Sequence, residues 1–204
     1  SFNDWINVKS MMLLWKKSFH SFKKAWQKNK LAKKLDELFF NHHSTCYGAI
    51  VAFGKNAADP HHENDDTPLR KGDCVLIDMG CVYKGYCSDM TRTFFYEGIL
   101  EEEIKVYEIV KKANEAAEAM IKPGVKLSDI DKCARKVISD EGYGKYFTHR
   151  LGHFIGRDVH EYGDVSSVNE MEVEEGMIFF NWTRYLFRRK FRSTCRRSSY
   201  GDKR

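Results

Sequence analysis

The spacing of hydrophobic positions changes along the chain, and these changes predict an alternation of strands and helices. Short segments rich in apolar residues predict strands at residues 47–54, 74–78 and 92–96. Apolar residues three and four positions apart indicate amphipathic helices over residues 31–38, over residues 101–121 and after Ser128. Residues 59–66 between these elements are predicted to be a loop. Strands mixed with helices in this way predict an α+β fold.

Each predicted helix has one apolar face. The first helix has Leu31, Leu35 and Leu38 on that face. The second is expected to bury Ile104, Tyr107, Val110, Ala113, Ala117 and Met120, and to stop at Pro123-Gly124. The third is expected to bury Ile130, Ala134, Val137 and Ile138. Ser128, with Asp131 three residues on, is predicted to cap this third helix, and Gly142 and Gly144 to end it.

Two aspartates stand eleven residues apart at the ends of predicted strands. Asp78 closes the run 74–78, and Asp89 comes just before the run 92–96. Taken singly, an Asp at a strand end is usually a turn former. On paired strands, two carboxylates can instead share a pair of hard cations about 3.5–4 Å apart, which hold a hydroxide and polarise a carbonyl.

A second polar block begins at Arg150. Gly152 and Gly156 frame His153, and His160-Glu161 follow. A lone His in a glycine-framed loop is more often a surface residue than a ligand. The spacing Gly-His-x-x-Gly-x-x-x-His-Glu, in a chain that also carries the two aspartates, favours metal ligation, because imidazole and carboxylate together suit divalent ions such as Mn²⁺.

These two blocks, in this order, resemble the pita-bread metallopeptidases, which include methionine aminopeptidases, Xaa-Pro aminopeptidases and Xaa-Pro dipeptidases. The resemblance runs from about Leu31 to Phe179. It implies a curved antiparallel sheet backed by helices, with the site in the concave face and the fold incomplete at both ends. We therefore divide the chain into an atypical flank (1–30), a truncated catalytic domain (31–180) and an atypical basic tail (181–204).

The resemblance also implies the metal ligands. The family binds two divalent ions through Asp, Asp, His, Glu and Glu, and the first three match Asp78, Asp89 and His153. The ions are expected to be Mn²⁺, with Co²⁺, Zn²⁺ or Fe²⁺ as alternatives. His160 matches a family histidine that contacts the substrate and the tetrahedral intermediate. A second substrate-facing histidine matches His61 or its neighbour His62, with His61 preferred because it directly follows Pro60.

The branch of the family is indicated by two short segments. Residues 56–62 and Val168-Asn169 resemble the Xaa-Pro aminopeptidases more than the methionine aminopeptidases. The implied activity is removal of N-terminal residues from peptides with proline in the second position, and a homodimer is an open option. Xaa-Pro dipeptidase is an alternative within the same class. An inactive pita-bread module that binds peptides or proteins is an alternative from a different class, and metal binding discriminates the two.

The two glutamates of the family's metal set have no match after Phe179. Residues 181–204 contain no Glu and seven Arg, which is typical of a disordered basic tail. A shift of reading frame is the alternative interpretation. With codons chosen from the degenerate options, and TGA for Trp182, a one-base advance turns residues 180–185 into Ser-Ile-Glu-Pro-Gly and residues 192–203 into Gly-Val-Arg-Val-Glu-Asp-Arg-Val-Met-Val-Ile. We therefore expect the chain as written to be impaired.

Charge narrows the range of partners. The net charge is +5, but residues 1–30 carry seven Lys and one Asp, and residues 181–204 carry nine Lys or Arg and one Asp. The predicted catalytic domain is therefore acidic, with a net charge of −9. A nucleic-acid surface would be a basic patch on the folded part, so we expect no nucleic-acid partner.

The remaining composition predicts a cytoplasmic protein without a membrane span. The chain contains no apolar run of about 18 residues, and its first residues lack the basic-then-apolar layout of a signal peptide. Six cysteines occur without a Cys-x-x-Cys pair. Reduced thiols in a cytosolic protein are the expected interpretation.

Overall fold

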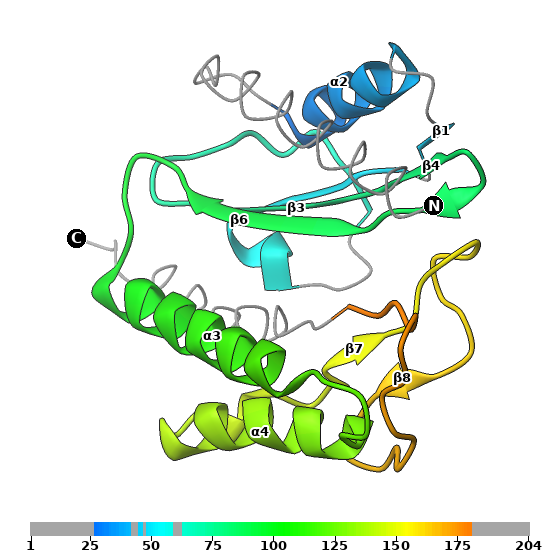
Figure 1. The fold of residues 1–204 in the computed structure, drawn as a ribbon. Coiled ribbons are helices and arrows are strands. Elements are labelled where there is room, and N and C mark those ends of the chain that lie inside the picture. Colours follow the sequence, from blue (N-terminus) through cyan, green and yellow to red (C-terminus); the bar gives the residue numbers. More distant parts are fainter. Residues whose placement is uncertain (1–26, 42–44, 47, 59–62, 181–204) are drawn as a thin grey trace. The chain divides into compact units, whose positions relative to one another are not determined.

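The computed structural model describes residues 27–41, 45–46, 48–58 and 63–180. The chain divides into two compact units, the first formed by residues 1–57 with 61–99 and the second by residues 58–60 with 100–204. Among the described residues, unit 1 combines an α-helix with antiparallel strands, and unit 2 combines the helices α3 and α4 with a short sheet (Figure 1). The predicted α+β class is therefore confirmed. None of the described helices has the length and apolar character needed to cross a membrane.

Unit 1 contains the elements predicted for it, with slightly different bounds. In chain order they are α2 (Lys28–Asn41), β1 (Thr45–Cys46), β2 (Ile50–Phe53), the 3₁₀ helix η2 (Gly54–Ala58), β3 (Cys74–Met79), β4 (Cys81–Tyr83), β5 (Tyr86–Cys87) and β6 (Met90–Phe95). The strands form two three-stranded antiparallel sheets, β2-β3-β6 and β1-β4-β5. Residues 63–66 of the predicted loop have no regular structure, and residues 59–62 lie outside the described residues.

A single long hairpin connects the two sheets. Met79 pairs with Met90 at the end of the β3–β6 ladder, and Val82 pairs with Cys87 in the β4–β5 ladder. The two ladders keep one register, so neither side of the hairpin carries an inserted residue. At the tip, Lys84 and Gly85 have φ angles of 51° and 81°. Positive φ at both central residues is the pattern of a type I′ turn, whose twist matches that of the flanking strands.

Helix α2 covers one face of the β2-β3-β6 sheet. Its Leu31 and Leu35 pack in a buried cluster with strand residues Val51, Phe53, Val75, Ile77 and Met79. Successive strand residues point to opposite faces, and a second buried cluster on the other face consists of Ala52, Ala57, Cys74 and Leu76. A slip of one residue would exchange the two faces of β3, so burial on both sides fixes its register. The side chain of Leu38, predicted on the apolar face of α2, lies outside the described residues.

The first residue of α2 is held by an ion pair. The side chain of Lys28 is fully buried, and its Nζ lies 2.7 Å from Oδ1 of Asp65. Asp65 also accepts the backbone N–H of Thr67 at 2.8 Å. The hydrogen bond from Lys28 holds the pKa of the Asp65 carboxyl well below its usual range. The helix thus begins at Lys28, slightly before the predicted start at Leu31.

Unit 2 contains both predicted helices and a small sheet. Its elements are α3 (Glu101–Met120), α4 (Leu127–Asp140), the 3₁₀ helix η3 (Gly144–Tyr146), β7 (Gly152–His153) and β8 (Asp164–Val165). Figure 1 shows α3 and α4 side by side, with β7 and β8 near α4. Gly142, with a φ of 82°, follows the end of α4 as predicted.

The buried face of α3 agrees in part with the predicted one. Its buried residues are Glu103, Val106, Ile109, Val110, Ala113 and Ala117. Ile104 and Tyr107, which were expected in the core, are 44% and 41% exposed. At 3.6 residues per turn, repeated steps of three move around the helix by about 60° each, whereas alternating steps of three and four stay on one side. Val110, Ala113 and Ala117 are buried as predicted. Ile104 and Tyr107 were reached from Val110 by repeated steps of three and therefore lie off the buried side.

The predicted cap of α4 is also wrong. The helix starts at Leu127, after Lys126, and no side chain caps it. The backbone N–H groups of Leu127 and Ser128 instead donate to the carbonyls of Met171 at 2.9 Å and Asn169 at 2.8 Å. Ser128 is fully buried and its Oγ donates to Glu170 at 3.0 Å. Because carbonyls from a distant segment accept these N–H groups, a local cap is unnecessary. The spacing of Ser128 and Asp131 carries no information about these distant carbonyls.

Glu103 makes the stability of unit 2 depend on pH. Its Oε2 accepts the backbone N–H of Leu100 at 2.8 Å, at the start of α3. Burial raises the pKa of this carboxyl in the folded protein. Its contribution to the free energy of unfolding is therefore most favourable below the pKa of the unfolded chain, about 4.3. That contribution is lost as the pH rises through the pKa of the folded protein. Glu103→Gln keeps the acceptor and removes the charge, so we expect it to stabilise the protein at pH 7 and to have little effect at pH 4. Urea unfolding at both pH values measures the difference, and equal effects would contradict the prediction.

Candidate active site

Asp78 and Asp89 emerge on the same face of the long hairpin. Asp78 lies on β3 directly opposite Thr91 of β6. Asp89 precedes β6, and the unbroken register sets it opposite Gly80, two residues after Asp78. Residues two apart share a face of a strand, so the two aspartates are diagonal neighbours, which typically lie about 7–8 Å apart. That spacing lets both carboxylates reach a pair of cations between them.

The aspartates face away from α2. The α2 side of the sheet carries Ile77 and Met79, which flank Asp78 in sequence and point the opposite way. The Asp78 side begins with the cluster around Leu76 and ends with the two carboxylates. The face is therefore apolar along the ladder and acidic at its end.

Hydrogen bonds of the neighbouring residues Thr91 and Ser88 fix the surroundings of both aspartates. Thr91 Oγ1 donates to Asp78 Oδ1 at 2.8 Å. Next to Asp89, the buried Ser88 closes the gap between the two ladders: its backbone N–H donates to the carbonyl of Cys81 at 2.8 Å. In return, the N–H of Cys81 donates to Ser88 Oγ at 3.1 Å. The backbone on either side of Asp89 is thus held in the hairpin.

His153 lies on β7 in the interior of unit 2, where it is 2% exposed. Its Nδ1 lies 3.0 Å from the carbonyl oxygen of Phe154. A carbonyl only accepts, so Nδ1 carries the proton in this contact, and in the neutral ring Nε2 then carries the lone pair. A backbone carbonyl that holds Nδ1–H in this way is the usual support of a metal-binding imidazole.

The strand of His153 is held on both of its edges. On one side, His153 pairs with Asp164 of β8, and the N–H of Leu151 donates to the carbonyl of Val165 at 2.9 Å. On the other side, the N–H of Phe180 donates to the carbonyl of His153 at 2.9 Å. Neighbours on both edges restrict the backbone position of His153.

His160 is brought to His153 by the loop between them. The two rings have centroids 4.4 Å apart at an angle of 45°. The loop returns because the N–H of Glu161 donates to the carbonyl of Phe154 at 3.1 Å. His160 itself is exposed, so a buried and an exposed imidazole lie next to each other.

The structure gives Glu161 a role that the sequence left open. Its Oε1 accepts the N–H of Arg157 at 2.7 Å and closes the loop. A Cβ on Gly156 would lie within 2.4 Å of the same oxygen, so this glycine makes room for the carboxylate. Gly156 and Glu161 therefore shape the loop that carries His160.

The sequence analysis did not identify a buried ion pair that contacts the segment before His153. Asp131, fully buried on α4, pairs with Arg135 at 2.8 Å and accepts the N–H of Leu151 at 3.1 Å. Arg135 donates to the carbonyls of Phe147 at 2.7 Å and His149 at 3.0 Å. The pair therefore attaches the segment leading to β7 onto α4. An Asp and an Arg four residues apart on a predicted helix was the available signal.

The predicted site residues are distributed over both units. Asp78 and Asp89 belong to unit 1, whereas His153 and His160 belong to unit 2. His61 lies outside the described residues. Within the part of the chain that the structure describes, no three His, Cys, Asp or Glu side chains form a metal-binding group. The predicted site, which joins the two aspartates with three histidines, therefore stays a prediction.

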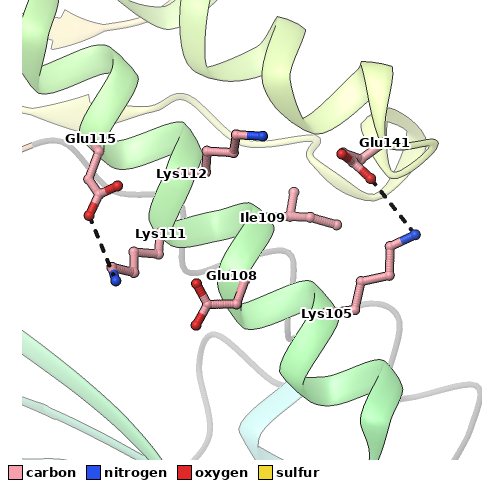
Figure 2. Close-up of a pocket in the computed structure, with 7 residues that line it drawn as sticks. All are labelled: Lys105, Glu108, Ile109, Lys111, Lys112, Glu115 and Glu141. Carbon is pink, nitrogen blue, oxygen red and sulfur yellow. Dashed lines mark ion pairs between the residues drawn. The ribbon is translucent and has the colours of Figure 1, made fainter.

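A surface hollow in unit 2 has no relation to these residues. Figure 2 shows it along α3 and at the end of α4, with ion pairs of Lys105 with Glu141 at 3.8 Å and Lys111 with Glu115 at 3.9 Å. Its lining residues are Lys105, Glu108, Ile109, Lys111, Lys112, Glu115 and Glu141. None of the predicted site residues belongs to this set, so we do not include the hollow in the candidate site.

Comparison with known proteins decides the family. The sequence model of metallopeptidase family M24 matches residues 12–194 of the chain. The chain belongs to metallopeptidase family M24. An uncharacterized peptidase of Staphylococcus epidermidis is 48% identical to this M24 chain over 132 residues, which are 65% of the chain and 38% of the relative.

Solved structures agree with the family. A dipeptidase from Pyrococcus horikoshii has a TM-score of 0.79 and 38% identity, over 84% of this chain and 49% of that one. An X-Pro aminopeptidase from Thermotoga maritima has a TM-score of 0.79 and 29% identity, over 88% of this chain and 53% of that one. The predicted pita-bread fold of the M24 peptidases is thereby confirmed. This M24 chain spans about half the length of these structures.

Proposed function

We propose that the chain is the metal-binding part of an aminopeptidase that acts on peptides with proline in the second position. Asp78, Asp89 and His153 are the proposed ligands of two divalent cations, with Mn²⁺ as the first candidate, and His61 and His160 are the proposed catalytic histidines. Membership of a metallopeptidase family supports the metal-dependent chemistry. We extend the proposal to a cytoplasmic protein, on the basis of its cysteine pattern.

The shared face of Asp78 and Asp89 is the observation that carries the proposal. Two carboxylates at diagonal positions of one hairpin repel each other unless a cation lies between them. Hard divalent ions prefer carboxylate oxygens, and a buried imidazole with its lone pair on Nε2 is a common additional ligand. The donor set therefore fits Mn²⁺ and related ions.

The protein's own groups have separate tasks in this proposal. When bound, the cations supply Lewis acidity and lower the pKa of water toward about 7. Asp78 and Asp89 hold the positive charge in place. The exposed imidazole of His160, held against His153, donates a hydrogen bond to the oxygen that becomes negative during peptide cleavage.

The length of the substrate separates two versions of the proposal. Relatives include a protein named as a dipeptidase and one named as an X-Pro aminopeptidase. We favour the aminopeptidase because residues 56–62 and Val168-Asn169 resemble that branch. Turnover of Arg-Pro-Pro but not of the dipeptide Arg-Pro is the expected result, and the reverse preference would identify a dipeptidase.

The segment after Phe179 determines how active the chain is. The family's two glutamates are not found in residues 181–204, which contain no Glu. We propose that a shifted reading frame accounts for this, and that a frame-restored chain carrying Glu-Pro-Gly and Val-Glu-Asp would complete the ligand set. The chain as written is then expected to bind Mn²⁺ weakly and to hydrolyse little.

Metal binding and turnover, measured on both chains, test the function. Calorimetry with Mn²⁺ is expected to detect two tight ions only in the frame-restored chain, which also turns over Arg-Pro-Pro. Asp89→Asn is expected to abolish both properties, while Asp140→Asn, at the exposed end of α4, leaves them unchanged. Tight binding and full turnover by the chain as written would contradict the frame shift. Peptide binding without metal-dependent turnover in either chain would identify an inactive binding module instead.

A further inference from the structure

The contact between Thr91 and Asp78 joins the two sides of the long hairpin on its acidic face. The residues are directly opposite each other in the β3–β6 ladder. Thr91 Oγ1 lies 2.8 Å from Asp78 Oδ1, and both side chains are half-buried. A carboxylate only accepts hydrogen bonds, so the threonine hydroxyl is the donor.

We propose that Thr91 is a positioning residue that orients the Asp78 carboxylate for the cation, an inference that rests on the proposed metal function. The hydrogen bond engages one lone pair of Oδ1 and sets the rotation of the carboxylate about its Cβ–Cγ bond. That rotation is otherwise broad, because terminal sp³–sp² torsions have no sharp minima. Thr91 is itself β-branched and stiff at χ1, so the donor is held in place before any cation arrives.

The hydroxyl is not required for the strand. Valine has the same branched shape as threonine and, like threonine, favours strands. Position 91 neighbours the apolar part of the face around Leu76, where a methyl group is acceptable. A threonine here costs nothing in strand formation and adds a donor at the carboxylate, which points to a function for the hydroxyl.

Thr93 provides a matched comparison on the same strand. It lies opposite Leu76, two residues from Thr91 and on the same face, and it is also half-buried. Thr93→Val therefore makes the same chemical change on the same face of the same strand. The residue opposite is apolar in this case and is not a carboxylate. A general effect of losing a hydroxyl from β6 would appear equally in Thr91→Val and Thr93→Val.

The experiment measures the Mn²⁺ affinity of the full chain. The EPR signal of the free ion is recorded, because this method is suited to weak binding. We expect Asp78→Asn to remove the binding and Thr91→Val to weaken it about 10–100-fold, the usual effect of losing a hydrogen bond to a metal ligand. Thr91→Ser, which keeps the hydroxyl, is expected to restore the affinity, and Thr93→Val to leave it unchanged. Equal melting temperatures of the variants separate this effect from unfolding.

A second measurement needs no metal. The ¹³C resonance of the Asp78 side-chain carboxyl, assigned by its loss in Asp78→Asn, is expected to shift in Thr91→Val and to return in Thr91→Ser. Unchanged affinity and an unchanged carboxyl resonance in Thr91→Val would overturn the role of Thr91 while leaving the metal centre intact. Mn²⁺ binding that does not depend on Asp78 would contradict the proposed metal centre, and the role of Thr91 with it.

Discussion

Replacing Asp131 with alanine is expected to lower the free energy of unfolding by about 3–5 kcal/mol, because it breaks a buried ion pair. The side chain of Asp131 is fully buried, whereas that of Arg135 is 30% exposed. The change leaves the N–H of Leu151 without its carboxylate acceptor and removes the charge that holds the Arg135 guanidinium. Since Arg135 bonds two further carbonyls before β7, the segment leading to His153 is expected to loosen as well.

Urea unfolding measures this effect, and two variants control it. Asp129→Ala removes an exposed carboxylate of the same helix whose ion pair with Lys132 is 3.6 Å long, so its cost is expected to be below about 1 kcal/mol. Asp131→Asn keeps an acceptor for Leu151 and should cost less than Asp131→Ala. Equal costs for Asp129→Ala and Asp131→Ala would mean that the buried pair contributes nothing specific.

His160→Ala in the frame-restored chain is expected to lower kcat on Arg-Pro-Pro about 10²–10³-fold, by analogy with the loss of one oxyanion donor. The exposed ring of His160 lies against the buried ring of His153, so it can contact a substrate without being a ligand. Mn²⁺ affinity should therefore change much less than kcat. This difference distinguishes a catalytic histidine from a metal ligand.

His149→Ala is a suitable control for this prediction. His149 belongs to the same unit, and its Nδ1 contacts the backbone carbonyl of Arg150 at 3.0 Å. It has no place in the proposed mechanism, so kcat should stay unchanged. An unchanged kcat in His160→Ala would remove His160 from the mechanism, and a parallel loss of Mn²⁺ affinity would make it a ligand.

The sequence predicted the elements whose pattern is local. Strand β3 was visible as a short apolar run, and α3 and α4 as periodic stretches, so the fold class and family could be predicted from residues near each other in sequence. The hairpin position of Asp78 and Asp89 followed from the same signals. The choice of His153 and His160 depended on motif spacing, and their ring contact agrees with a shared loop.

The wrong cap of α4 concerns an interaction between distant segments. Ser128 looks like a helix cap in its own neighbourhood, yet carbonyls of residues 169 and 171 take that role. The sequence left the role of Glu161 open, and the hydrogen bond that it accepts from the N–H of Arg157 explains its position in the loop. Side-chain partners of this kind depend on tertiary packing, which hydrophobic spacing does not encode.

The uninterrupted register of the long hairpin has a consequence for changes in chain length. Two residues added symmetrically in the turn at Lys84-Gly85 would lengthen the tip and leave both aspartates on their shared face. A single residue inserted between Met79 and Cys81, or between Cys87 and Asp89, would put the β4–β5 ladder out of register with the β3–β6 ladder and break the contacts between Cys81 and Ser88 beside Asp89. Insertions at the tip are therefore expected to be tolerated in natural and engineered variants, while single insertions beside the aspartates are not.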